Sequence, residues 1–187
     1  MAPNERPKAQ LHTRYPWSSV IIYNGTTIAH YVLGGIGIIM GFSFSPWAGY
    51  VFGALYLLFS FMEMYVIMPL TVCPSCAYYR LDNSLCVSGL NVVSRQVAKK
   101  KNQKAFAKRA EGPFCFNNMY IAALVIPIVA IIAALIVEFS VPLLVILLSL
   151  VILLLFRFFV IFPKIACLHC AAKYQCPQAK SMGVREL

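Results

Sequence analysis

Charged residues are scarce in this chain of 187 residues. They make up 12% of the sequence, whereas a soluble domain has about 25%. Acidic residues are the scarcest, with six against sixteen lysines and arginines, while 60% of the residues are hydrophobic and the mean hydropathy is +0.75. So much apolar surface needs an apolar solvent. The composition therefore excludes an ordinary soluble domain and indicates an integral membrane protein.

Several common functional signatures are also absent. Residues 1–20 are polar and basic and lack the short apolar core of a signal peptide, so we expect no cleavable leader. The sequence contains no phosphate-binding loop, catalytic triad or zinc-protease helix motif, and side chains suited to a hydrolase are too sparse. The chain is also small for a complete enzyme, so we expect a subunit that works with a partner.

Four apolar stretches are each long enough to cross a bilayer, which takes about 20 residues. Short connections join them into two tight hairpins. We therefore predict an all-α integral membrane fold with four transmembrane helices, at residues 26–44, 47–70, 119–139 and 142–162. In the first hairpin, the pairs Gly37/Gly41 and Gly49/Gly53 have the four-residue spacing that lets helix backbones approach closely.

The basic residues predict which side of the membrane each segment occupies. Fifteen of the sixteen lysines and arginines lie outside the hairpins, and Arg157 is the exception. Because cytoplasmic segments carry the excess of Lys and Arg, the charge of +10 marks a cytoplasmic side, and we expect no nucleic-acid partner. The predicted parts are an N-terminal segment (1–25), hairpin 1 (26–70), a Cys-rich basic loop (71–118), hairpin 2 (119–162) and a Cys-rich tail (163–187).

Two further features follow from this topology. Aromatic residues near the span ends are expected in interfacial belts; these are Trp17, Tyr23, Trp47 and Tyr120. Residues 95–109 contain seven basic residues. They form a solvated segment, a surface for anionic lipid or a docking site for an acidic partner.

The two halves of the chain resemble each other at an offset of 94 residues. Residues 66–77 and 160–171 share the pattern V-I-x-P-x-x-x-C-x-x-C-A, with six identities in twelve positions. This predicts an internal duplication whose copies have the same orientation and are related by a pseudo-two-fold axis along the membrane normal. Pro69 and Pro163 are predicted to end their helices, since proline breaks the backbone hydrogen bonding.

The same offset aligns Glu63 with Arg157, each inside a predicted span. Ionisable residues at that depth are costly and often pair. A pseudo-axis between the second and fourth helices would bring them together, so we predict an intramembrane ion pair. In the alternative, Arg157 reaches the interface and Glu63 is protonated or faces water.

The cysteines are the strongest chemical signal. All seven fall in the predicted cytoplasmic segments, and each repeat supplies a C-x-x-C pair plus a third cysteine; they are Cys73, Cys76, Cys86, Cys115, Cys167, Cys170 and Cys176. In a reducing compartment such pairs are more often metal-binding or redox-active than disulfide-bonded. Two C-x-x-C pairs could form one site, each repeat could hold its own metal with a fourth ligand such as Cys115 or His169, or the thiols could be redox pairs.

Iron–sulfur and zinc both suit these ligands. Cys176-Pro177 resembles the Cys-Pro that closes bacterial ferredoxin motifs, which implies an iron–sulfur cluster, although the full ferredoxin run is absent. We predict an iron–sulfur cluster, with zinc as the alternative. His30, with Glu63, is a candidate for binding quinone or haem, but a hydrogen-bonded core histidine is the simpler interpretation.

The leading functional hypothesis is a membrane electron-transfer subunit that docks a soluble partner on the cytoplasmic face. A non-catalytic scaffold held together by zinc is the alternative, and a small transporter or metal carrier is the second. The expected partners are membrane lipid and a protein at the cysteine-rich face.

Overall fold

The computed structural model describes residues 10–42, 45–99, 116–174, 176, 179 and 182–184. Apart from two isolated bridges, the regular structure in these ranges is all helical. The elements are α1 (Trp17–Gly41), α2 (Pro46–Met62), the π-helix η1 (Glu63–Ile67), α3 (Met68–Thr71), the short 3-10 turns η2 (Cys73–Ser75) and η3 (Ala77–Tyr79), α4 (Leu90–Val97), α6 (Phe116–Val137), α7 (Val141–Phe156) and the π-helix η4 (Arg157–Ala166).

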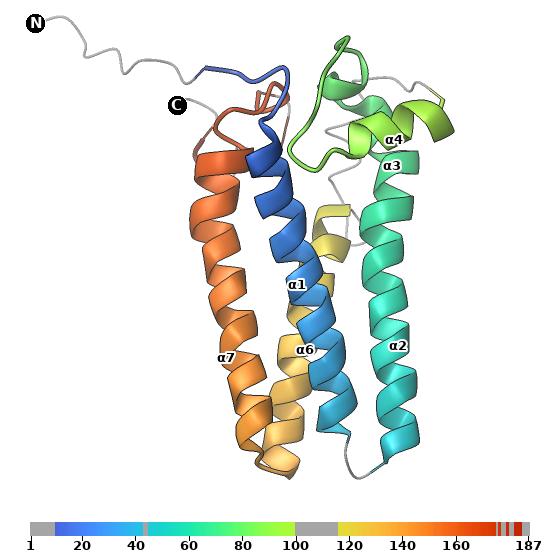
Figure 1. Cartoon of the computed structure of the whole chain (residues 1–187), viewed down its shortest axis with the longest axis vertical. Helices are drawn as coiled ribbons and strands as arrows, with labels where there is room; N and C mark the ends of the chain where they lie inside the picture. The colour runs from blue at the N-terminus through green and yellow to red at the C-terminus, as the bar shows by residue number, and fades with distance from the viewer. Residues whose placement is uncertain are drawn as a thin grey trace, which may run out of the picture.

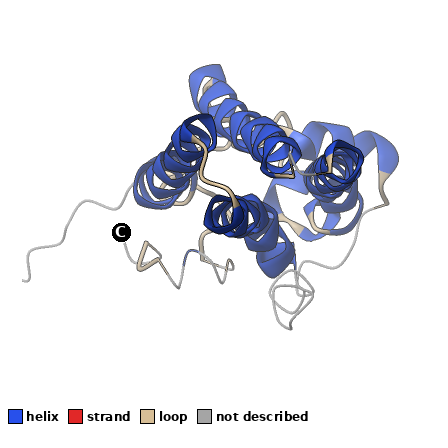
Figure 2. Ribbon diagram, turned by 90° about the horizontal axis from the view of Figure 1, so that it is seen from below, coloured by secondary structure: helices blue, strands red, loops and turns tan. Residues whose placement is uncertain are grey.

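The long helices α1, α2, α6 and α7 form a bundle (Figures 1 and 2). α1 packs against each of the other three. In Figure 1, α7 lies on one side and α2 on the other, with α1 and α6 between them. At one end of the bundle the hairpins turn; at the other end lies a layer that we call the cap, made of residues 10–16, 72–99 and 167–174 (Figure 1).

Within the described ranges, three helices are long and apolar enough to cross a membrane: Trp47–Ser75, Asn118–Val137 and Val141–Ala166. Much of their apolar surface faces outward. Ile136, Ile152 and Phe159 are 81%, 65% and 70% exposed. An apolar exterior of this extent is stable in lipid rather than in water.

α1 is the least apolar of the long helices, and it is not one of the three candidate spans. It begins at Trp17 rather than at the predicted residue 26. Because it contacts three protein neighbours, it carries buried polar side chains, including Thr27 and His30. Tyr23, predicted at the interface, is also buried, as is Tyr120 in α6, whereas Trp17 and Trp47 are exposed.

The glycines allow close helix packing, as their spacing predicted. A Cβ atom on Gly37 would collide with the Ile131 side chain of α6, and one on Gly41 would lie 2.8 Å from Ala134. A Cβ on Gly49 of α2 would lie 2.7 Å from the backbone oxygen of Ile39 in α1. α1 therefore approaches both neighbours at distances that only glycine permits.

Neither Pro69 nor Pro163 ends its helix, so that prediction is wrong. α3 continues past Pro69 to Thr71, and η4 continues past Pro163 to Ala166. The π-helical turns explain this. Their N–H groups bond five residues back, as from Cys167 to Phe162 at 2.7 Å, and the wider turn accommodates a ring that would collide with an α-helical carbonyl.

Candidate functional site

The N-terminal segment of the cap, residues 10–16, joins the two cysteine-bearing segments. The His12 N–H donates to the His169 carbonyl at 2.8 Å, and the Tyr15 N–H donates to the Leu85 carbonyl at 2.9 Å. The imidazoles of His12 and His169 are stacked, with ring centroids 4.6 Å apart. Residues from opposite ends of the chain thus form one layer.

The two C-x-x-C pairs lie at this same end of the bundle. Cys76, Cys86 and Cys170 pack against one hydrophobic cluster, which contains Tyr15, Val20, Tyr78 and Leu85. Cys73 and Cys167 pack against a second cluster beneath it. The six described cysteines are free thiols. Cys115 lies outside the described residues.

The thiols of the two halves interact with one another. Cys76 interacts electrostatically with Cys86, Cys170 and Cys176. Burial, reinforced by neighbouring thiols, raises the pKa of Cys76 and of Cys167 to about 12 and that of Cys170 to about 11. In the absence of metal these groups are neutral thiols at neutral pH.

Among the described residues, no three Cys, His, Asp or Glu side chains converge closely enough to hold one metal ion. His169 is oriented by the Gln10 carbonyl, 2.8 Å from its Nδ1. Since a carbonyl only accepts, Nδ1 carries the proton, and the lone pair of the neutral ring is on Nε2. The cap therefore holds ligand atoms of the predicted kinds near one another but not in a coordinating arrangement.

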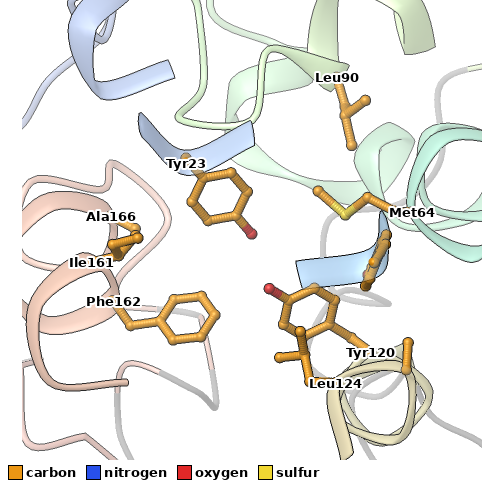
Figure 3. Packing of buried hydrophobic residues seen from close by; sticks show 10 residues of the cluster. Tyr23, Met64, Leu90, Tyr120, Leu124, Ile161, Phe162 and Ala166 are labelled. Atoms are coloured by element: carbon orange, nitrogen blue, oxygen red, sulfur yellow. The ribbon is translucent and has the colours of Figure 1, made fainter. Parts of the chain in front are cut away.

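A second polar group of residues lies inside the bundle, around Arg157. The guanidinium is buried and donates to Thr27 Oγ1 at 2.6 Å and to Thr26 Oγ1 at 3.3 Å. Three aromatic rings surround its central carbon, with centroids at 4.7 Å (Tyr23), 5.2 Å (Tyr120) and 5.5 Å (Phe162). In Figure 3 the hydroxyls of Tyr23 and Tyr120 point into the same interior space, which the ring of Phe162 faces.

Glu63 does not form the predicted direct ion pair with Arg157. Its side chain is fully buried, and neither carboxyl oxygen has a hydrogen-bond partner. In Figure 1, α1 and α6 lie between α2, which leads into Glu63, and α7, which leads into Arg157. Tyr31 and Tyr120 interact electrostatically with both residues.

His30 is a buried, hydrogen-bonded core histidine. Its Nε2 lies 2.9 Å from the Leu124 carbonyl oxygen of α6, so Nε2 carries a proton. That nitrogen is engaged, and haem ligation would have to use Nδ1. The arrangement agrees with the simpler interpretation of this residue.

Sequence reasoning missed the tyrosines and threonines around Arg157. The signal was present as a polar stripe on α1, where Tyr23, Thr27 and His30 recur at helical spacing.

No family model matches the chain, and no curated protein or solved structure is significantly similar to it.

Proposed function

We propose that the chain is a membrane-integral electron-transfer subunit whose cap binds a metal centre and docks a soluble protein partner. Four helices, α1 included, would cross the bilayer as two repeated hairpins, with the cap on the cytoplasmic side. The proposed centre is an iron–sulfur cluster. Its ligands would come from Cys73, Cys76, Cys86, Cys167, Cys170 and Cys176, with Cys115 as a further candidate.

The repeat is supported by the way α1 meets α6. His30 hydrogen-bonds Leu124, and Gly37 packs on Ile131; both pairs are separated by the offset of 94 residues. Equivalent residues meet in this way when a two-fold axis runs between parallel helices. The two π-helices begin at Glu63 and Arg157, which are also 94 residues apart. α1 itself has 25 residues, enough for a span of about 30 Å.

The observation that carries the proposal is the gathering of reduced thiols from both halves in one cap. Such thiols are ligands for iron–sulfur clusters and zinc, and a bound cluster would supply one-electron chemistry at the membrane surface. Because no three described side chains already converge, loading must draw the cysteine-bearing segments after α3 and η4 together. The basic residues of the neighbouring segments give the cap a charge suited to an acidic partner and anionic lipid.

Two features weigh on the alternatives. Backbone hydrogen bonds through His12 and Tyr15 already hold the cap together, so a purely structural zinc has less to stabilise. The bundle core contains fully buried Leu124, Ile131 and Leu150, which leave no evident aqueous route for a transporter.

Anaerobic purification tests the proposal. Protein with a thiolate-ligated cluster should be brown, absorb near roughly 400 nm and contain iron and sulfide. Cys76→Ser and Cys170→Ser should lose this absorption. Ser75→Ala is the matched control, because Ser75 lies within the first C-x-x-C and its buried hydroxyl has no partner. Colourless protein with stoichiometric zinc would favour the scaffold, and protein without metal would overturn metal binding.

A further inference from the structure

The centre of the bundle holds an unusual number of polar atoms without hydrogen-bond partners. In the described part of the chain, eight buried side-chain nitrogen or oxygen atoms lack one. Five of the eight belong to four residues, which we call the polar cluster: Tyr31, Glu63, Tyr120 and Arg157. The two tyrosines interact electrostatically with each other and with both Glu63 and Arg157. The four residues come from α1, η1, α6 and η4 and meet between the helices.

Leaving these atoms bare would be expensive. An unsatisfied buried polar group destabilises the folded state, and a charged one does so more strongly. Five such atoms would offset a large part of the small net stability of a typical domain. An apolar guest would relieve none of this cost. Water relieves it, because the cluster offers guanidinium and hydroxyl donors together with carboxyl and hydroxyl acceptors.

We infer that the polar cluster is a hydrated proton-binding site, in which Glu63 takes up and releases a proton through water held by Tyr31 and Tyr120. In uptake, a hydronium ion transfers its proton to a Glu63 carboxylate oxygen and becomes water; release is the reverse, and no electron moves. Arg157 stays charged throughout. The cluster alternates between net charges of zero and +1. The site is independent of the proposed metal centre.

The neighbours of the cluster define the surroundings of Glu63 and a direction for exchange. The titratable groups that interact with Glu63 are Tyr31 from α1 and Tyr120 from α6, and both also interact with Arg157 of η4. Tyr23 interacts with Arg157 and also with the cap thiols Cys86 and Cys167. Tyr23 therefore connects the polar cluster to the cap, which is the side from which we expect protons to exchange.

Infrared difference spectroscopy of the full chain in lipid, recorded between acidic and alkaline pH, tests the site. We expect a carboxylic-acid C=O band that appears on acidification, shifts in D₂O and is wholly lost in Glu63→Gln. Glu138→Gln, at the far end of α6, is the matched control and should keep the band. Tyr31→Phe and Tyr120→Phe should each shift its frequency, which keeps the test decisive if Glu63→Gln fails to fold.

Three results would overturn the inference. The band that Glu63→Gln removes could be present but unchanged across the pH range, which would mean a static carboxyl. It could fail to shift in D₂O, which would mean a dry site. It could keep its frequency in both phenylalanine variants, which would remove the tyrosines from the path.

Discussion

The Tyr56 hydroxyl of α2 donates a hydrogen bond to the Ala123 carbonyl of α6 at 2.9 Å. Ala123 lies four residues before Pro127, which has no N–H and cannot donate to this carbonyl within the helix. A side chain of one helix thus replaces the hydrogen bond that proline removes from another. The contact explains how α6 tolerates an interior proline and fixes α2 against α6.

Removing the Tyr56 hydroxyl should therefore destabilise the bundle. We expect Tyr56→Phe to lower the free energy of unfolding by about 1–3 kcal/mol, because it leaves a buried carbonyl unpaired. In a Pro127→Ala background, where the alanine N–H restores the helical bond, the same substitution should cost less. Denaturant unfolding in detergent measures the four proteins of the cycle. Equal losses of stability in the two backgrounds would show that the Tyr56 hydroxyl does not compensate for the missing N–H of Pro127.

The sequence predicted the elements of the bundle better than their arrangement. Hydrophobic length and short turns located the long helices, because membrane-crossing helices must be long and apolar. The glycine contacts also followed from spacing alone. The offset of 94 residues places Glu63 and Arg157 at equivalent positions of the two halves, but no sequence pattern says which helices lie next to one another. That choice depends on packing at Gly37 and Gly41, which draws α6 onto α1.

For the candidate sites, too, the sequence predicted the position of residues along the chain better than their surroundings. Residue type and spacing placed the cysteines at one end, since hairpins return the chain to its starting side. The hydrophobic pattern predicts Tyr23 at the interface because it starts the first span at residue 26, whereas α1 begins at Trp17 and Tyr23 is buried against Arg157. The continuation of the helices beyond Pro69 and Pro163 was unforeseen, because π-turns have no sequence signature of their own.

Gly49 offers a test of the close approach between α1 and α2. Gly49→Ala should cost about 1–3 kcal/mol of stability, because its Cβ would meet the Ile39 backbone oxygen, which cannot rotate away. Gly25→Ala is the control: nothing lies within 4 Å of its Cβ, so it should be neutral or slightly stabilising. Thermal unfolding in one detergent compares the two. A Gly49→Ala protein as stable as Gly25→Ala would contradict the packing.

The bundle should lose more stability when the hydrogen bond from Arg157 to Thr27 is removed than when the one to Thr26 is removed. Thr27→Val removes the acceptor at 2.6 Å while preserving shape, so a buried guanidinium N–H loses its partner at a cost of about 1.5–3 kcal/mol. Thr26→Val should cost less, since its contact is 3.3 Å long and its side chain is partly exposed. The unfolding midpoints of the two variants measure the difference. A lower midpoint for Thr26→Val than for Thr27→Val would show that the contact to Thr26 matters more.

The cap thiols should react slowly in metal-free protein. A pKa of about 12 for Cys76 and Cys167 and about 11 for Cys170 leaves little thiolate, the nucleophilic form, at neutral pH. Mass spectrometry after iodoacetamide treatment should show slower alkylation of these three than in the denatured chain, with rates that rise as the pH approaches 11. Metal uptake should release protons. Equal rates in the native and denatured proteins would mean that the thiols are neither buried nor neutral.

Acidification should loosen the N-terminal segment of the cap. Burial, and secondarily the facing imidazole of His169, lowers the pKa of His12 below its ordinary value of 6.5. The undocked segment therefore binds a proton at a higher pH than the docked one. Its docking is strongest above pH 6.5 and weakens as the pH falls from there through the lowered pKa of His12.

Hydrogen exchange at the His12 and Tyr15 amides measures this docking, since both donate across the cap to His169 and Leu85. Corrected for intrinsic rates, their protection should fall below pH 6.5. His12→Phe keeps an aromatic ring against His169 but cannot be protonated at that position, so its protection should depend far less on pH. If His12→Phe loses protection over the same pH range as the wild type, the acid sensitivity originates elsewhere in the cap, because residue 12 can no longer take up a proton in this variant.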